Sequence, residues 1–188
     1  MGILDHIEDY TLNELDLCNE IEGKTTLLKA VKPYREDYDL SKLQYPEFYP
    51  ELSNEKVLVT RFIEGETFDE MLSEDKLSYD QLLELFNIHG FFLFAPGIFH
   101  GDIHPGNIIL SPDNNIHFVD TSAVSQVGEK IRTGLFRFFE ALSKYDYNMC
   151  AQHLNEMAEK QIDGEAFDSF NEKFKELYKD FSDSTVKE

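Results

Sequence analysis

Apolar residues recur at the three- and four-residue spacing of an α-helix in several stretches of the chain. The last stretch is the most regular. There, Phe167, Phe170, Phe174, Leu177 and Phe181 form one stripe that we expect to pack in a core or against a partner. The same spacing predicts helices over residues 11–31, 82–92, 131–142 and 147–160.

Polar residues mark where two of these helices begin. Thr11 and Glu14 have the T-x-x-E spacing of a capping box, in which each side chain accepts a hydrogen bond from the other residue's backbone. Asp146 precedes the helix over residues 147–160 and is expected to be its N-cap. Gly164 interrupts the pattern before the final helix.

Runs of β-branched and apolar residues predict short strands between the helices. Residues 56–63 form one such run, which Gly65 closes. Residues 107–110 and 116–119 form two more, and the turn-forming residues 111–115 between them predict a β-hairpin. An irregular connection is expected in the tyrosine-rich stretch that contains Pro33, Pro46 and Pro50.

The composition indicates one folded domain with an acidic surface. A chain of 188 residues can bury a hydrophobic core, and its 13% of aromatic residues argue against disorder. The formal net charge of −20 opposes binding to nucleic acid or an anionic membrane, because both carry the same sign. Any phosphate ligand must therefore be held by local hydrogen-bond donors or by a cation.

The sequence predicts a protein of the cytoplasm without a transmembrane segment. The most apolar run, residues 91–99, is about half the length that a membrane-spanning helix needs and contains Pro96 and Gly97. Cys18 and Cys150 lack the spacing of a metal site, and a reduced compartment without a disulfide is expected.

The segment FHGDIHPGN, residues 99–107, carries the chemistry together with IHFVD, residues 116–120. A tight loop would present Asp102 and Asn107 to the same side, and the second hairpin strand would end in Asp120 beside Asn107. One amide oxygen and one carboxylate form an oxygen pair suited to Mg²⁺. Asp102 would stand where it can orient an acceptor hydroxyl or a water, as in phosphoryl transfer by kinase folds.

Each of these residues also has a purely structural interpretation. Asp102, Asn107 and Asp120 could cap and brace a loop, and His100 is expected to brace the loop rather than react. His104 could approach a substrate or a phosphate, or it could be a solvated loop histidine.

Three sets of residues resemble the UbiB/AarF family of atypical protein-kinase-like proteins, the bc-one-complex activity group. Residues 97–107 are similar to that family's G-x-F-H-A-D-P-H-P-G-N, and Glu14-Leu-Asp16 followed by Glu20 resembles its E-x-D motif. The third set resembles its central strand, hinge and later helices, and comprises residues 51–53, 57–65, 139–142 and 145–147. The resemblance runs from about Glu14 to Phe181.

The resemblance implies an α+β fold: a mainly helical protein-kinase-like C-lobe and a reduced N-lobe. The reduced N-lobe would comprise an αC-type helix and one or two strands, and the C-lobe would carry a short catalytic-loop hairpin. We expect a single kinase-like domain over residues 1–181, with the N-lobe remnant and hinge in 1–65 and the helical C-lobe in 66–181. Residues 182–188 would form a polar tail.

The resemblance also implies ATP and Mg²⁺ as cofactors. Asp102 would be the catalytic-loop acid, and Asn107 and Asp120 the metal ligands. Nucleotide-site residues would further include His104, and Glu14 and Asp16 as the family's acidic pair near the phosphates. Glu20 would match the helix glutamate that pairs with the nucleotide-binding lysine. Glu14 fits the capping box equally, and Asp16 fits a solvated acid in a first helical turn.

The chain also departs from the family. Asp120-Thr-Ser122 replaces the usual Asp-Phe-Gly, and no phosphate loop or lysine-bearing strand precedes the αC-type helix in this sequence. We expect an ATP-binding ATPase or phosphotransferase linked to quinone or lipid metabolism, completed by a partner chain or by self-association. The alternatives are an inactive pseudokinase or scaffold, a gene remnant, or an aminoglycoside- or choline-type phosphotransferase, since those enzymes share the HGD-x-HPGN loop.

Overall fold

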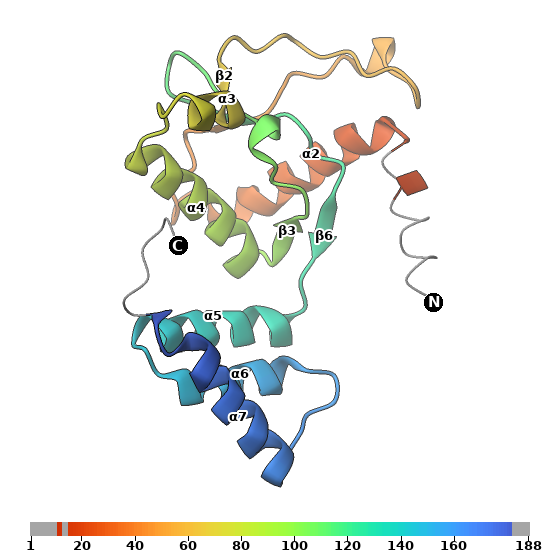
Figure 1. The fold of residues 1–188 in the computed structure, drawn as a ribbon. Coiled ribbons are helices and arrows are strands. Elements are labelled where there is room, and N and C mark those ends of the chain that lie inside the picture. The colour runs from red at the N-terminus through yellow and green to blue at the C-terminus, as the bar shows by residue number, and fades with distance from the viewer. Residues whose placement is uncertain (1–10, 13–14, 182–188) are drawn as a thin grey trace. The chain divides into compact units, whose positions relative to one another are not determined.

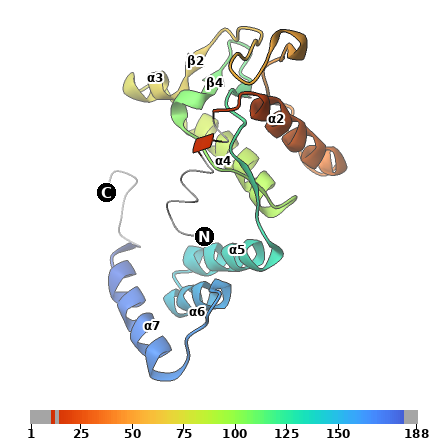
Figure 2. The ribbon, with the colours of Figure 1, turned by 90° about the vertical axis from the view of Figure 1, so that its right-hand side faces the viewer.

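The computed structural model describes residues 11, 12 and 15–181, and Figures 1 and 2 show it from two directions. The chain forms two compact units, of which one ends at Gln126 and the other begins at Val127. Helices and short strands together confirm the predicted α+β class. The single kinase-like domain over residues 1–181 stays a prediction.

Capping boxes start two helices of the first unit. The side chains of Thr67 and Glu70 cap α3 (Phe68–Ser73), and those of Ser78 and Gln81 cap α4 (Tyr79–Phe94). None of the helices that the structure describes is long and apolar enough to span a membrane. The helices of this unit are α2 (Cys18–Val31), α3 (Phe68–Ser73) and α4 (Tyr79–Phe94), and its 3₁₀ turns are η1 (Lys32–Tyr34), η2 (Pro50–Leu52) and η3 (Pro105–Asn107).

The main sheet has four strands in the order β1-β5-β4-β2. β1 runs parallel to β5, and the other neighbours are antiparallel. The predicted hairpin is confirmed as β4–β5, in which Ile109 pairs with His117. A second, two-stranded antiparallel sheet pairs β3 with β6. The strands are β1 (Leu43–Gln44), β2 (Glu66–Thr67), β3 (Ile98–His100), β4 (Ile108–Leu110), β5 (Ile116–Phe118) and β6 (Val124–Gln126).

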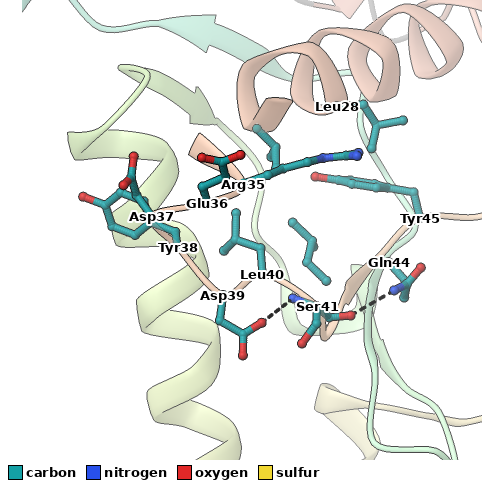
Figure 3. A pocket seen from close by; sticks show the side chains of 12 residues that line it. Leu28, Arg35, Glu36, Asp37, Tyr38, Asp39, Leu40, Ser41, Gln44 and Tyr45 are labelled. Carbon is teal, nitrogen blue, oxygen red and sulfur yellow. Dashed lines mark hydrogen bonds between the residues drawn. The ribbon is translucent and has the colours of Figure 1, made fainter. Parts of the chain in front are cut away.

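The segment that links η1 to β1 is fixed by tyrosine contacts with α4. The Tyr34 hydroxyl donates to the carbonyl oxygen of Ala95 at 3.3 Å. The Tyr34 ring packs edge-on against Phe91, with 5.6 Å between centroids. This segment, residues 35–42, borders a cavity beside α2 (Figure 3).

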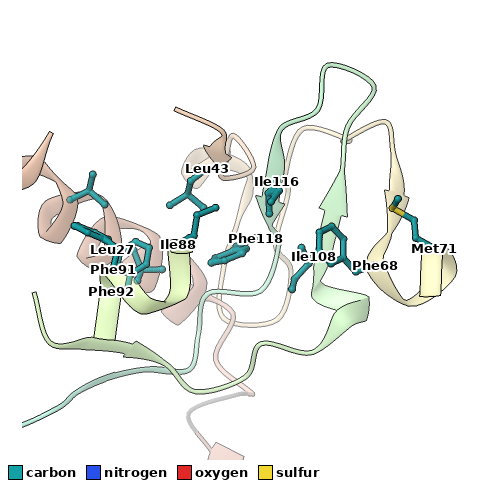
Figure 4. Packing of buried hydrophobic residues seen from close by; sticks show 11 residues of the cluster. Leu27, Leu43, Phe68, Met71, Ile88, Phe91, Phe92, Ile108, Ile116 and Phe118 are labelled. Carbon is teal, nitrogen blue, oxygen red and sulfur yellow. The ribbon is translucent and has the colours of Figure 1, made fainter. Parts of the chain in front are cut away.

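The hydrophobic core of the first unit joins α2, α4 and the β4–β5 hairpin (Figure 4). Leu27 from α2, Ile88 from α4 and Ile116 from β5 are all at most 1% exposed. Burying a side chain of this size contributes roughly 1.5–3 kcal/mol, so the cluster holds the hairpin against the two helices. Its other members are Val31, Leu43, Phe68, Met71, Phe91, Phe92, Ile108 and Phe118.

α2 touches the backbone that follows β5 at a glycine. A Cβ placed on Gly23 would lie 1.7 Å from the backbone oxygen of Thr121, well inside van der Waals contact. A glycine in a helix interior ordinarily costs about 1 kcal/mol relative to alanine. Here the missing side chain allows the helix to reach the Thr121 backbone.

The second unit comprises α5 (Glu129–Ser143), α6 (Tyr147–Met157) and α7 (Gly164–Tyr178). Asp146 is the N-cap of α6, as predicted, because its Oδ1 accepts a hydrogen bond from the Met149 backbone at 3.1 Å. α6 ends at Met157, before the predicted residue 160. The core of this unit consists of Phe138, Ala141, Cys150, Ala151 and Phe174.

The predicted apolar stripe of α7 is buried only in part. Phe174 packs edge-on against Phe138, with centroids 6.3 Å apart, and stacks on Tyr178 at 4.5 Å. Leu177 is 79% exposed and lies outside this core. The stripe therefore contributes to the core mainly through Phe174 and its ring contacts.

The continuous helix predicted over residues 11–31 is wrong, because a turn interrupts it after the helical residues 11 and 12. Residues 15–17 form a turn, and α2 begins at Cys18. Two hydrogen bonds hold the chain in this turn: Cys18 donates from its backbone to Asp16 Oδ1 at 3.0 Å, and Leu17 donates to the Glu55 carbonyl at 3.0 Å. The Glu14 part of the expected capping box lies outside the described residues.

The strand predicted over residues 56–63 is also wrong. The segment forms isolated bridges, Val57 with Asn54 and Thr60 with Phe48, instead of a continuous ladder. Asn54 accepts hydrogen bonds from the backbone of Lys56 and Val57, which turns the chain. The pairing ends after Tyr49, because the Tyr49 carbonyl accepts from the Leu52 backbone in η2. The Val59 backbone donates to Ser53 Oγ at 3.0 Å.

We predict that Gly23→Ala destabilises the protein. The added methyl group would overlap the Thr121 oxygen, and overpacking of this kind costs about 1–3 kcal/mol, more than the gain in helix propensity. Urea denaturation followed by circular dichroism measures the change in the free energy of unfolding.

Gly90→Ala is the matched control, since Gly90 is also inside a helix but no atom lies within 4 Å of a Cβ placed there. This variant should gain up to about 1 kcal/mol. Equal stabilisation by both substitutions would show that α2 does not approach Thr121 closely.

Candidate functional site

His100 connects the two aspartates of the predicted catalytic site. It ends β3 and is 3% exposed. Its Nε2 lies 2.5 Å from the carbonyl oxygen of Asp120, and its Nδ1 lies 3.3 Å from the backbone nitrogen of Asp102. Because a carbonyl only accepts and an N–H only donates, the ring is neutral and carries its proton on Nε2. Both ring nitrogens are thus used to brace the loop.

Two further contacts fix this brace. The His100 ring packs edge-on against Phe118 of β5, with 5.7 Å between centroids. The backbone of Gly101 donates to the carbonyl of Ala123 at 2.6 Å, next to the β3–β6 pair. The loop that carries Asp102 is therefore attached to the segment after β5 through side-chain and backbone bonds.

Asp120 follows β5, and both of its carboxylate oxygens have partners. Asn107 donates from Nδ2 to Oδ2 at 3.3 Å. Ser122 donates to Oδ1 from its backbone at 3.3 Å and from its hydroxyl at 3.0 Å. Asn107 is itself placed by η3 and by the Val119 backbone, which donates to its carbonyl at 3.0 Å. Asn107 and Asp120 thus meet as the sequence predicted.

Glu20 of α2 is joined to the residue after Asp120. Its Oε2 accepts a hydrogen bond from the Thr121 backbone at 2.6 Å, and the Thr121 hydroxyl donates to the Glu20 carbonyl at 2.7 Å. Thr121 is fully buried and Glu20 is 7% exposed. Burial raises the pKa of the Glu20 carboxyl, and the negative charge of nearby Asp120 raises it as well.

Of the other residues predicted for the nucleotide site, Asp16 and His104 bond to nearby backbone groups. Asp16 lies at the start of α2, where its carboxylate accepts from the Cys18 backbone. His104 is an exposed residue before η3, and its Nδ1 accepts from the Gly106 backbone at 3.1 Å. Glu14 lies outside the described residues. The structure therefore brings Asn107, Asp120 and Glu20 together, and His100 links the backbone of Asp102 to that of Asp120.

The chemistry of this donor set fits Mg²⁺. Among the described residues, no three His, Cys, Asp or Glu side chains form a group that could hold a metal ion by themselves. Mg²⁺ does not need one, because it is usually bound by one or two carboxylates while phosphate oxygens and water complete its coordination. Asn107 and Asp120 could supply the protein ligands of the Mg²⁺ ion.

Sequence reasoning missed the roles of three residues. Thr121 and Ser122 were seen only as departures from Asp-Phe-Gly, yet Thr121 binds Glu20 and Ser122 holds the Asp120 carboxylate. Ser122 binds Asp120 two residues earlier in the pattern of an Asx turn, which an Asp-x-Ser sequence permits. Gly23 was also overlooked, although a glycine inside a helical pattern signals close packing.

Comparison with known proteins identifies a family. The family model of the ABC1 atypical kinase-like domain matches residues 1–154. The chain is 26% identical over 173 residues to an uncharacterized aarF domain-containing protein kinase of Arabidopsis thaliana chloroplasts, covering 89% of this chain and 31% of that protein. It is 29% identical over 153 residues to the probable protein kinase UbiB of Sodalis glossinidius, covering 77% and 27%.

The chain spans about a third of the length of the curated relatives that it matches. Among solved structures it is similar to Rv3197 of Mycobacterium tuberculosis in complex with erythromycin, with a TM-score of 0.62 and 20% identity over 97% of this chain and 44% of that one. This likeness shows a shared fold. With the family match, it confirms the predicted kinase-like fold.

We predict that Thr121→Val lowers the free energy of unfolding by about 1–2 kcal/mol, because the buried Glu20 carbonyl loses its hydrogen bond while the side-chain shape is kept. Thermal or urea denaturation measures the effect.

Thr26→Val is the matched control. Its hydroxyl also bonds a backbone carbonyl, that of Glu22 at 3.0 Å, but on an exposed face of α2. The loss there should stay below about 0.5 kcal/mol. If the two variants lose equal stability, the Glu20–Thr121 bonds do not anchor α2.

Proposed function

Because this chain belongs to the UbiB/AarF family of ABC1 atypical kinase-like domains, we propose that it binds ATP with Mg²⁺ at Asp102, Asn107 and Asp120. The observation that carries the proposal is the contact between the Asn107 and Asp120 side chains, together with the His100 ring that joins the backbones of Asp120 and Asp102. The loop is fixed before any ligand arrives, which favours binding because little ordering is needed.

Asn107 and Asp120 would hold Mg²⁺, which supplies positive charge that neutralises the phosphate groups. This neutralisation matters especially in a protein as acidic as this one. At a net charge of −20, a nucleotide approaches against general repulsion, and the site itself contains Asp102 and Asp120. ATP binding is therefore expected to depend strongly on the divalent cation.

Asp102 would act on the reacting groups if the protein turns over ATP. A carboxylate at this point of a kinase-like loop can orient a water or an acceptor hydroxyl and accept its proton. The brace from His100 to the Asp102 backbone limits the positions of that carboxylate. We propose an ATPase or phosphotransferase activity, linked through the family to quinone or lipid metabolism.

The contacts of Glu20 favour a second candidate, a nucleotide-binding protein that does not catalyse transfer. In active kinase folds a glutamate of this helix pairs with the lysine that contacts the phosphates. Here the Glu20 carboxylate accepts from the Thr121 backbone and hydroxyl, at 2.6 and 3.2 Å, and lies buried. Phosphoryl transfer would use a lysine and a phosphate-binding loop, and we propose that a second copy or a partner chain can supply them.

We predict that Asp120→Asn weakens Mg²⁺-dependent ATP binding by at least about tenfold, since the substitution removes the only formal charge of the Asn107–Asp120 pair. Isothermal titration calorimetry with ATP, in Mg²⁺ and in EDTA, measures the dissociation constants.

Asp168→Asn on α7 is the control, because it removes the same charge from an exposed position in the second unit. It should leave ATP affinity unchanged. Wild-type binding that does not need Mg²⁺, or an equal effect of both substitutions, would contradict the proposed site.

We predict that Asp102→Asn lowers ATP turnover by about 100-fold or more while ATP affinity changes less than about threefold, because the carboxylate acts on the reacting oxygen rather than on the metal. Phosphate release in the presence of Mg²⁺ measures turnover, and calorimetry measures affinity. Wild-type protein that binds Mg²⁺–ATP without any turnover would instead support the second candidate.

A further inference from the structure

A cavity of about 810 Å³ lies in the first unit, beside α2 and apart from the residues of the nucleotide site. It is bordered by the C-terminal half of α2, the linking segment 35–42 and β1. Its volume lies in the range of small-molecule sites, roughly 300–1,000 Å³. No residue of the proposed nucleotide site lines this cavity, so the cavity could bind a different ligand.

The wall of the cavity is mainly apolar where it meets the core. Val31 and Leu43 belong to the core cluster, and Leu40 packs against it. Leu28 borders the cavity from α2 and is 41% exposed. An apolar body of moderate size would bury these side chains away from water, which is the usual basis of affinity in such sites.

The Tyr45 hydroxyl provides a polar group inside this wall. Its ring is held edge-on against Phe118 of the core, with 6.3 Å between centroids. Figure 3 shows the hydroxyl directed toward the Arg35 side chain, among the residues that line the cavity. The oxygen is buried, and within the part of the chain that the structure describes it has no hydrogen-bond partner. Burial also raises the pKa of Tyr45, so the hydroxyl keeps its proton and can donate.

Charges at the rim indicate which ligand fits. In Figure 3 the Arg35 side chain extends across the cavity, and Arg35 forms no ion pair with any described residue. Three carboxylates, those of Glu36, Asp37 and Asp39, border the same space. They outnumber the single cation, so an anionic ligand would be repelled. Arg35 and Tyr45 both offer donors, which suits an uncharged acceptor.

We propose that this cavity binds an uncharged molecule with an apolar body and a hydrogen-bond-accepting oxygen. The apolar body lies against Leu28, Leu40 and Leu43, and the oxygen accepts from the Tyr45 hydroxyl. This binding site is separate from the nucleotide site, and its occupation does not require Mg²⁺ or ATP.

The test uses prodan, an uncharged naphthalene ketone whose fluorescence reports its surroundings, added to the full chain without nucleotide. We expect saturable binding of one prodan per chain. Tyr45→Phe should weaken this binding by about three- to tenfold, because the carbonyl loses a neutral donor. The same variant should not lower the melting temperature of the free protein, because the hydroxyl that it removes has no partner there.

Leu28→Trp should weaken binding by about tenfold or more, because the larger ring fills the cavity from its exposed edge. The controls are Tyr79→Phe and Leu83→Trp, which change exposed residues of α4 outside the cavity and should leave prodan affinity unchanged. The anionic naphthalene probe 8-anilino-1-naphthalenesulfonate should bind at least about tenfold more weakly than prodan.

The proposal is overturned if prodan fails to saturate at one site, or if Tyr45→Phe and Leu28→Trp bind it as tightly as the wild type. It is equally overturned if the sulfonate probe binds as tightly as prodan, since the carboxylates would then not select an uncharged ligand.

Discussion

The segment that follows β5 is the constraint on which the first unit depends. Within four residues it receives the His100 ring at Asp120, the Glu20 carboxylate at Thr121 and the Gly101 backbone at Ala123. The helix α2, the catalytic-type loop and the β4–β5 hairpin thus share one anchor. Because the Glu20–Thr121 bonds are buried and directional, a shift of α2 would leave buried polar groups without their partners, which is costly.

Locally encoded features could be read from the sequence. The β4–β5 hairpin, the Asp146 cap and the meeting of Asn107 with Asp120 each depend on residues within about 15 positions of one another. The kinase-like fold is predicted by the resemblance of residues 97–107 to the loop of the UbiB/AarF family. The Glu20–Thr121 bonds could not be read in this way, because they join residues 101 positions apart and no local pattern encodes such a contact.

The errors have a related cause. Residues 56–63 have strand composition, but a strand needs a continuous neighbour, and the facing chain turns into η2 after Tyr49, which leaves isolated bridges. Residues 15–17 have helical spacing, but Asp16 and Glu55 bind the backbone in a turn. In both places tertiary or side-chain bonds outweigh a weak local preference.

The lengths of the outer strands of the main sheet bear on how this chain can assemble. β1 and β2 contain two residues each, while the inner strands β4 and β5 contain three. A second chain that tried to extend the sheet would find only a few backbone groups at either edge, too few for a stable added strand. A second chain that binds at this sheet would therefore have to dock through side chains, and the side chains at the contact would select the partner.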